Sequence, residues 1–178
     1  MKVRISSRTQ RLKLAWLLAA PFLWFARPSP SFLLAGALLA IPGLLLRGVA
    51  AGHIEKDRVL AASGPYAYLR HPLYAGSFLV GLGYALAGGV WIFIPLFLAL
   101  FIWIYGGAVW AEEEELARRF GSEYRSYRDR VPALLPRMGP GGGWNFQLRL
   151  FLRNREWEAS LGVFGGLGIL WLKMIWTR

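Results

Sequence analysis

Long apolar stretches alternate with short polar or glycine-containing segments along the chain. The longest apolar stretch, from Pro72 to Ala111, contains no Asp, Glu, Lys, Arg or His and is interrupted only by a Gly88-Gly89 turn signal. A helix needs about 20 apolar residues to cross a bilayer, so this stretch is long enough for two crossings. The whole pattern predicts about five membrane-spanning helices, at residues 14–26, 31–51, 72–88, 90–110 and 159–176.

The second half of the chain carries two polar segments of different character. Between residues 112 and 131, apolar side chains recur every three or four positions, which predicts a helix with one apolar face. A glycine-rich break at 139–143 follows, and residues 144–158 then mix aromatic, apolar and basic side chains, as an interfacial helix does. We therefore divide the chain into a membrane core, 1–136, and a C-terminal extension, 137–178.

Composition agrees with a membrane protein. Of the 178 residues, 56% are hydrophobic and only 17% are charged, against about 25% charged in a typical soluble domain. The expected fold class is all-α, a polytopic membrane helix bundle. The absence of cysteine excludes disulfides, zinc–thiolate sites and a cysteine nucleophile, and two histidines are too few for a histidine-rich metal site. We expect no metal.

The basic residues predict the orientation. The net charge is +11, and most of the 21 lysines and arginines lie in the N-terminal segment, in 47–70 and in 118–155. Such residues stay on the cytoplasmic side and face anionic lipid, so we expect membrane lipids as partners rather than nucleic acid. Both polar segments then lie in the cytoplasm and the C-terminus outside. We expect a multi-pass protein of a bacterial or archaeal inner or plasma membrane, and the sequence leaves its oligomeric state open.

The first chemical motif is the segment from Gly64 to Tyr74, where the polar loop enters the third predicted span. Pro72 suits the first position of a helix, which places Arg70 and His71 at the helix N-terminus. Free backbone N–H groups there favour a carboxylate or phosphate. The alternative is a belt of arginine and tyrosine that only anchors the helix end at the lipid headgroups.

The second motif is a run of four glutamates, 112–115, directly after the fourth predicted span. Glu114 and Glu115 each have an arginine four positions on, so ordinary pairs along the helix explain them. Glu112 and Glu113 have no such partner and lie closest to the membrane. An acid at the edge of a span can bind a cation; alternatively, acids simply suit a helix start.

Together the two motifs resemble the isoprenylcysteine carboxyl methyltransferase family. The pattern G-P-Y-x-x-x-R-H-P-x-Y stands at 64–74, and E-E-x-x-L-x-x-x-F-G-x-x-Y-x-x-Y-x-x-x-V-P-x-x-x-P at 112–136. Phospholipid N-methyltransferases share this general layout. The resemblance covers roughly residues 30–136.

This resemblance implies a helical membrane bundle with an S-adenosylmethionine site at its cytoplasmic face. Glu112 would hold the charged methionine part of the cofactor with Glu113 beside it, and Glu112 and Arg70 are the candidate catalytic residues. The implied cofactor pocket consists of Leu60, Ala61, Tyr66, Arg70, His71, Pro72, Leu73, Tyr74, Glu112 and Glu113.

The implied reaction moves a methyl group to a lipophilic acceptor that enters from the bilayer, a prenylcysteine-type carboxylate or another lipid-like substrate. The sequence departs from the family pattern at two places that matter for this implied reaction. Ala108 stands where family members often carry an arginine for the substrate carboxylate, and residues 137–178 extend beyond the usual end. The alternatives are a non-catalytic membrane binding or assembly protein on the same scaffold, and a steroid-reductase-like membrane oxidoreductase.

Overall fold

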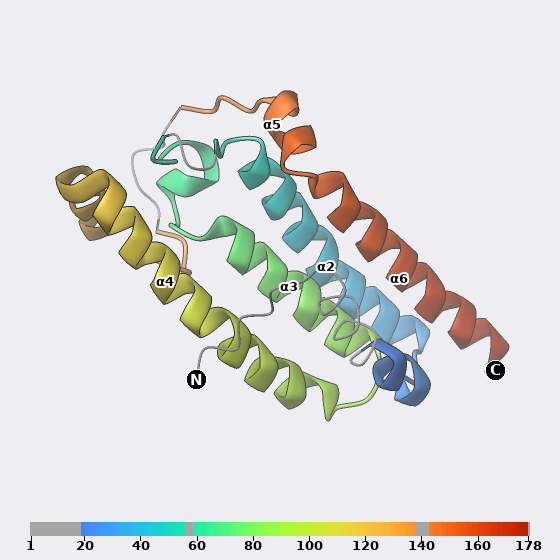
Figure 1. The fold of residues 1–178 in the computed structure, drawn as a ribbon. Helices are drawn as coiled ribbons and strands as arrows, with labels where there is room; N and C mark the ends of the chain where they lie inside the picture. The colour runs from blue at the N-terminus through green and yellow to red at the C-terminus, as the bar shows by residue number, and fades with distance from the viewer. Residues whose placement is uncertain (1–18, 56–58, 138–142, 178) are drawn as a thin grey trace.

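The structure is a computed structural model that describes residues 19–55, 59–137 and 143–177. These ranges form helices and connecting segments, with no strand among them (Figure 1). Residues 19–25 are helical. The elements that follow are α2 (Pro30–Ala51), the 3-10 turn η1 (Gly64–Ala67), α3 (Pro72–Ala87), α4 (Phe93–Arg130), α5 (Leu148–Arg153) and α6 (Glu156–Trp176).

The predicted helical membrane bundle is confirmed. Three helices, α2, α4 and α6, are long and apolar enough to cross a membrane, and α3 is a shorter apolar helix. Residues 14–18 of the predicted first span lie outside the described residues, and 19–25 of that span are helical. Of the predicted interfacial segment, only Leu148–Arg153 forms a separate helix, and Glu156 already begins α6.

The predicted fourth span runs on without a break into the first part of the predicted cytoplasmic helix, and both belong to α4, which is kinked at Gly121. The four glutamates therefore extend the membrane helix instead of opening a new one. Gly121 interrupts the helix with a φ of 54°, a left-handed conformation that glycine adopts without a Cβ clash. This kink turns the last part of α4 and fixes where Tyr124 and Tyr127 pack.

Small residues let α2 and α3 pack closely. A Cβ on Gly36 would lie 2.5 Å from the Gly83 carbonyl oxygen, and one on Gly43 would lie 2.7 Å from the Gly76 carbonyl oxygen. Helices in a membrane associate through such close backbone approach, because lipid offers no hydrophobic driving force between them. The α2–α3 pair is therefore closely packed at the centre of the bundle.

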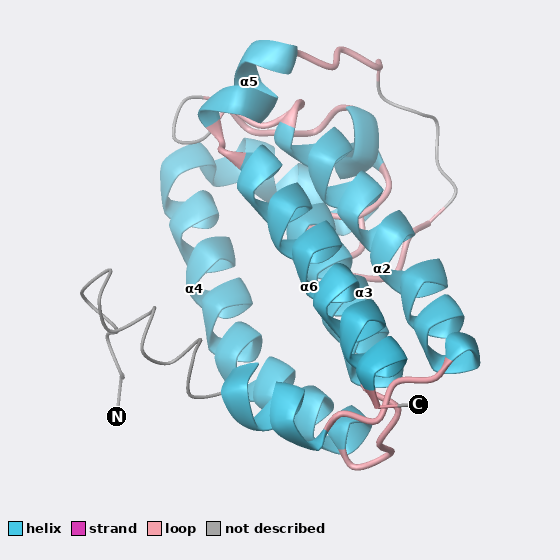
Figure 2. Ribbon diagram, turned by 90° about the vertical axis from the view of Figure 1, so that its right-hand side faces the viewer, coloured by secondary structure: helices cyan, strands magenta, loops and turns pink. Residues whose placement is uncertain are grey.

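The C-terminal extension belongs to the same bundle. Val163 of α6 packs against Ala40 and Leu44 of α2, and the Tyr84 hydroxyl of α3 donates to the Val163 carbonyl at 2.9 Å. Figure 2 shows α6 lying beside α2 and α3. The extension is thus part of the helical packing that surrounds the site.

Both polar segments lie at one end of the bundle, where η1, the start of α3, the middle of α4 and α5 come together (Figure 1). Along the rest of the bundle, large apolar side chains point outward: Trp103 is 70% exposed and Trp110 76% exposed. An outward apolar surface on helices of this length is what a bilayer requires. The chain is a membrane protein whose polar end contains the candidate site.

Candidate functional site

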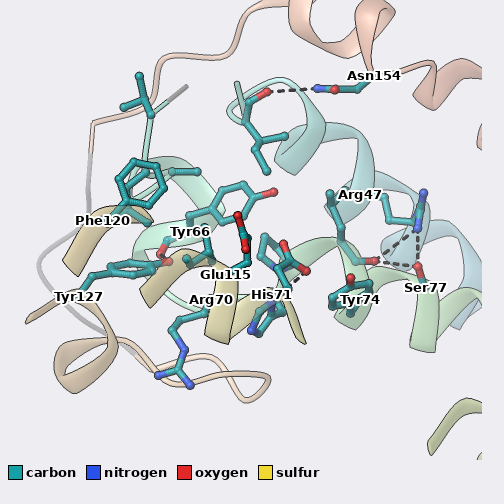
Figure 3. A pocket seen from close by; sticks show the side chains of 18 of the residues that line it. Arg47, Tyr66, Arg70, His71, Tyr74, Ser77, Glu115, Phe120, Tyr127 and Asn154 are labelled. Carbon is teal, nitrogen blue, oxygen red and sulfur yellow. Dashed lines mark hydrogen bonds and ion pairs between the residues drawn. The ribbon is translucent and has the colours of Figure 1, made fainter. Parts of the chain in front are cut away.

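A cavity of about 660 Å³ opens at the polar end of the bundle (Figure 3). Its size is within the range of about 300–1,000 Å³ that is usual for small-molecule and cofactor sites. The wall comes from the end of α2, the loop before η1, the first turns of α3, one face of α4 and the start of α6. Segments that are far apart in the sequence therefore line one cavity.

The structure brings together nearly all the site residues predicted from sequence. The cavity wall includes Leu60, Ala61, Tyr66, Arg70, His71, Pro72, Leu73, Tyr74 and Glu112. Glu113 does not contribute to the wall and instead lies behind it, bound to Arg70 and His71. The two motifs are thus in contact, with Glu112 toward the cavity and Glu113 toward the first turn of α3.

Glu113 forms a compact charged cluster with Arg70 and His71. Its Oε1 atom accepts from Arg70 Nη2 at 2.6 Å and Arg70 Nε at 3.1 Å, and lies 3.1 Å from His71 Nε2. Burial works against the charged form, but the hydrogen bonds from His71 and Arg70 outweigh it and hold the pKa of Glu113 below its usual value. Glu113 is therefore a carboxylate that fixes Arg70 and His71 in place.

Arg70 also binds the chain that follows α4. Its Nη1 donates to the carbonyls of Arg128 at 2.9 Å and Val131 at 3.0 Å, and its backbone N–H donates to Pro132 at 2.8 Å. Arg70 and His71 thus reach the same Glu113 oxygen, and Figure 3 shows both residues at the cavity. All these donors are engaged, so Arg70 holds α4 and its C-terminal segment against the start of α3.

Tyr127 gives a second link between the motifs. Its buried hydroxyl donates to the Tyr66 carbonyl at 2.7 Å. Tyr124, Tyr127 and Val131 form a buried cluster that packs against Leu60 and Phe120. The apolar face predicted for 112–131 thus faces η1 and the preceding loop, and it closes one side of the cavity.

The two outer glutamates pair along the helix as their spacing predicts. Arg119 Nε donates to Glu115 at 2.7 Å, and Arg118 lies 3.9 Å from Glu114. Glu115 nevertheless contributes to the cavity wall. Glu112 has a different environment, since its side chain is 40% exposed and lies 3.9 Å from His71 Nδ1.

Tyr66 presents a buried polar atom at the cavity. The residue is 5% exposed, and its hydroxyl has no hydrogen-bond partner within the described residues. Burial, and then the nearby charge of Glu112, raises the pKa of Tyr66 far above its ordinary value, so the hydroxyl stays protonated and can donate. A buried donor without a partner is costly unless something else accepts from it.

Further wall residues were not predicted from sequence: Arg47, Ser77, Tyr105, Asn154 and Glu156. Arg47 could have been found from the sequence, because a charged residue inside a predicted membrane span is a candidate functional residue. Glu156 gave no such signal, since acidic residues are common at helix starts. Only the packing of α6 against α2 brings Glu156 to Arg47.

Comparison with known proteins agrees with this arrangement. A sequence model of the family described as phospholipid methyltransferase matches residues 35–123, which contain most of α2, all of α3 and the glutamates of α4. The chain belongs to the phospholipid methyltransferase family. The match includes residues 64–74 and the glutamates 112–115, and it ends at residue 123, before the C-terminal extension.

Relatives named as protein-S-isoprenylcysteine O-methyltransferases confirm the resemblance to that family. The chain is 34% identical to protein-S-isoprenylcysteine O-methyltransferase of Schizosaccharomyces pombe over 111 residues, 59% of the chain and 47% of that protein. It is 36% identical to the Cupriavidus metallidurans cobalt-zinc-cadmium resistance protein CzcN over 117 residues, 61% of the chain and 53% of that protein. The aligned part of the chain spans about half the length of these relatives.

Proposed function

We propose that the protein is an S-adenosylmethionine-dependent methyltransferase that acts on a lipophilic acceptor. The meeting of the two motifs in one cavity at the polar end of a membrane bundle carries this proposal. The relatives named as protein-S-isoprenylcysteine O-methyltransferases support the methyltransferase class. Following the predicted orientation, we place this end of the bundle on the cytoplasmic side, where soluble cofactors are found.

The chemistry of the cavity suits such a cofactor. S-adenosylmethionine, when bound, supplies an electrophilic methyl group on a positively charged sulfur. Glu112 offers a half-exposed carboxylate for a cationic group, and Tyr66 offers a buried donor that has no partner among the described residues. Apolar side chains of Leu60, Leu116 and Phe120 provide a surface for an aromatic base. The residues present therefore fit the proposed cofactor.

Arg70 and Glu113 act as positioning residues in this proposal. Their ion pair, together with the bond from Tyr127 to the Tyr66 carbonyl, holds α4 against η1 and α3. This fixes the Glu112 side of the cavity relative to His71. Methyl transfer by direct displacement depends on such alignment and on exclusion of water, and a carboxylate acceptor needs no general base.

The acceptor is proposed to enter from the membrane. The cavity wall includes Tyr105 of α4 and Ser77 of α3, both within apolar helices. An acceptor can therefore place a polar head in the cavity while its apolar tail stays in the bilayer. A prenylcysteine-type carboxylate fits this description, as does another lipid-like substrate.

The decisive experiment measures cofactor binding and turnover with the purified full chain in detergent or nanodiscs. We expect calorimetric binding of S-adenosylmethionine and transfer of its radiolabelled methyl group to a lipid-soluble product. Binding of a reduced nicotinamide dinucleotide instead would favour the reductase alternative. Binding of neither, by a folded protein, would favour a non-catalytic membrane protein.

A further inference from the structure

The pair formed by Arg47 and Glu156 joins the family core to the C-terminal extension. Arg47 lies on α2 one turn before the end of the helix, and Glu156 is the first residue of α6. Arg47 Nε donates to Glu156 Oε1 at 2.5 Å, and the Glu156 side chain is only 7% exposed. Both residues contribute to the cavity wall.

The first turns of α3 hold the other side of the Arg47 guanidinium. Its Nη1 atom donates to the Ser77 hydroxyl and to the Leu73 carbonyl, the latter at 3.4 Å. Figure 3 shows Arg47 and Ser77 close together at one end of the cavity. Contacts from two neighbouring helices thus fix the orientation of the guanidinium plane.

These contacts leave one nitrogen of Arg47 and one oxygen of Glu156 free to bind a ligand. Within the described residues, Arg47 Nη2 donates no hydrogen bond to protein, and Glu156 Oε2 accepts none. The Arg47 side chain is 24% exposed. A guanidinium has five N–H donors in a planar arrangement that matches a carboxylate. The Nη2 group of Arg47 can therefore donate to a bound anion.

The other two arginines in the wall have partners of their own. Arg70 is bound by Glu113 and by two backbone carbonyls, and Arg119 is bound by Glu115. Arg47, at the end of the cavity near Ser77, keeps one guanidinium nitrogen, Nη2, that donates to no residue in the described part of the chain.

We propose that Arg47, oriented by Ser77 and neutralised by Glu156, is the carboxylate-binding residue of the cavity. This rests on the proposed function. The carboxylate belongs either to the acceptor or to the methionyl part of the cofactor. Glu156 is a positioning residue that compensates the buried charge when the site is empty, so the C-terminal extension takes part in substrate recognition.

The opposing charge of Glu156 has a consequence that distinguishes recognition from a merely structural pair. A carboxylate that binds Arg47 experiences repulsion from Glu156 close by. Replacing Glu156 with glutamine removes this repulsion and keeps the side-chain shape. The variant is therefore expected to be less stable than the parent protein and yet to bind a carboxylate more tightly.

The experiment uses the full chain in nanodiscs and two matched probes, N-acetyl-S-farnesylcysteine and its methyl ester, which lacks the carboxylate. The variants are R47Q, E156Q and the double variant R47Q/E156Q. The double variant removes both charges of the pair, so neither side chain is left as an unpaired charge and the protein is expected to fold. R153Q is the matched control, since Arg153 pairs with Glu55 and does not line the cavity. Dissociation constants are measured for both probes and for S-adenosylmethionine, with melting temperatures for every variant.

In the double variant we expect binding of the carboxylate probe to weaken about ten- to hundredfold, as for loss of a charged hydrogen bond, while binding of the methyl ester is unchanged. That result assigns the carboxylate to the acceptor. A similar loss confined to S-adenosylmethionine assigns it to the cofactor. E156Q should strengthen binding of the ligand whose affinity falls in the double variant. R153Q should leave the affinities for the carboxylate probe and for S-adenosylmethionine unchanged.

Unchanged affinities in the double variant, with only a lower melting temperature, would overturn the proposal and leave the pair a structural link. A parent protein that binds no S-adenosylmethionine would contradict the proposed function instead. The farnesylcysteine measurement does not depend on turnover, so it still tests Arg47 in that case.

Discussion

Arg70 Nη2 and Glu113 Oε1 lie 2.6 Å apart, although 43 positions separate the two residues in the sequence. The same Glu113 oxygen lies 3.1 Å from His71 Nε2. One carboxylate thus joins the residues just before α3 to the part of α4 that carries the other glutamates. This contact sets the width of the cavity between the two helices.

Replacement of Glu113 with glutamine should destabilise the protein strongly, because it leaves the Arg70 charge without its partner in a mostly buried place. Removing one partner of a buried pair costs about 3–5 kcal/mol, and the slight exposure here favours the lower end. The measurement is the unfolding transition in detergent. E114Q is the control, since Glu114 is exposed and lies 3.9 Å from Arg118; equal losses in both variants would show that the cluster adds nothing specific.

Acid should destabilise the protein through the same residue. The pKa of Glu113 in the folded protein lies below the usual value of 4.5. Its contribution to stability is therefore fully present above that value and is lost as the pH falls through the folded pKa. Melting temperatures between about pH 6 and pH 3 should fall less steeply in E113Q than in the parent. Parallel curves would contradict this assignment.

Replacement of Tyr66 with phenylalanine should weaken S-adenosylmethionine binding about two- to tenfold, as for loss of one neutral hydrogen bond. The hydroxyl is buried and has no protein partner in the described part of the chain, so stability should not fall. Y124F is a matched control, because the Tyr124 hydroxyl is also buried and unpartnered but does not line the cavity. A loss of binding in Y124F would point to an indirect effect of packing.

The glutamates of α4 should differ in their effect on cofactor binding. Glu112 lines the cavity, whereas Glu114 does not and is 62% exposed. We expect E112Q to weaken S-adenosylmethionine binding about ten- to hundredfold, and E114Q to leave it unchanged. Calorimetry on the two variants makes this comparison. A larger effect of E114Q would mean that the opposite face of α4 serves the cofactor.

Replacement of Gly43 with alanine should disrupt the contact between α2 and α3. The added Cβ would lie 2.7 Å from the Gly76 carbonyl oxygen, and overpacking of this kind costs about 1–3 kcal/mol. Gly106 of α4 is the control, because a Cβ there meets nothing within 4 Å. G106A should be neutral or slightly stabilising in the same unfolding measurement. Equal tolerance at both positions would contradict the close packing of the two helices.

Local patterns predicted most of the helices. The apolar run that ends near Ala51 and the Pro72 start signal gave α2 and α3 to within a residue or two. The sequence did not reveal that α4 continues through the glutamates, since an acidic run also suits a new helix start. The predicted interfacial helix was also too long, because the mixed composition of 144–158 does not show that residues 144–147 form no helix.

The sequence by itself determined which residues have the chemistry of a site, because each motif is local and its spacing within one helix is fixed. Only the tertiary structure decided which charged residues pair with each other across the bundle. Helical spacing explains the partners of Glu114 and Glu115, but it cannot show that Glu113 binds Arg70 or that Glu156 binds Arg47. Those pairs depend on how α4 and α6 pack against α2 and α3, which is a property of the whole bundle and of no single segment.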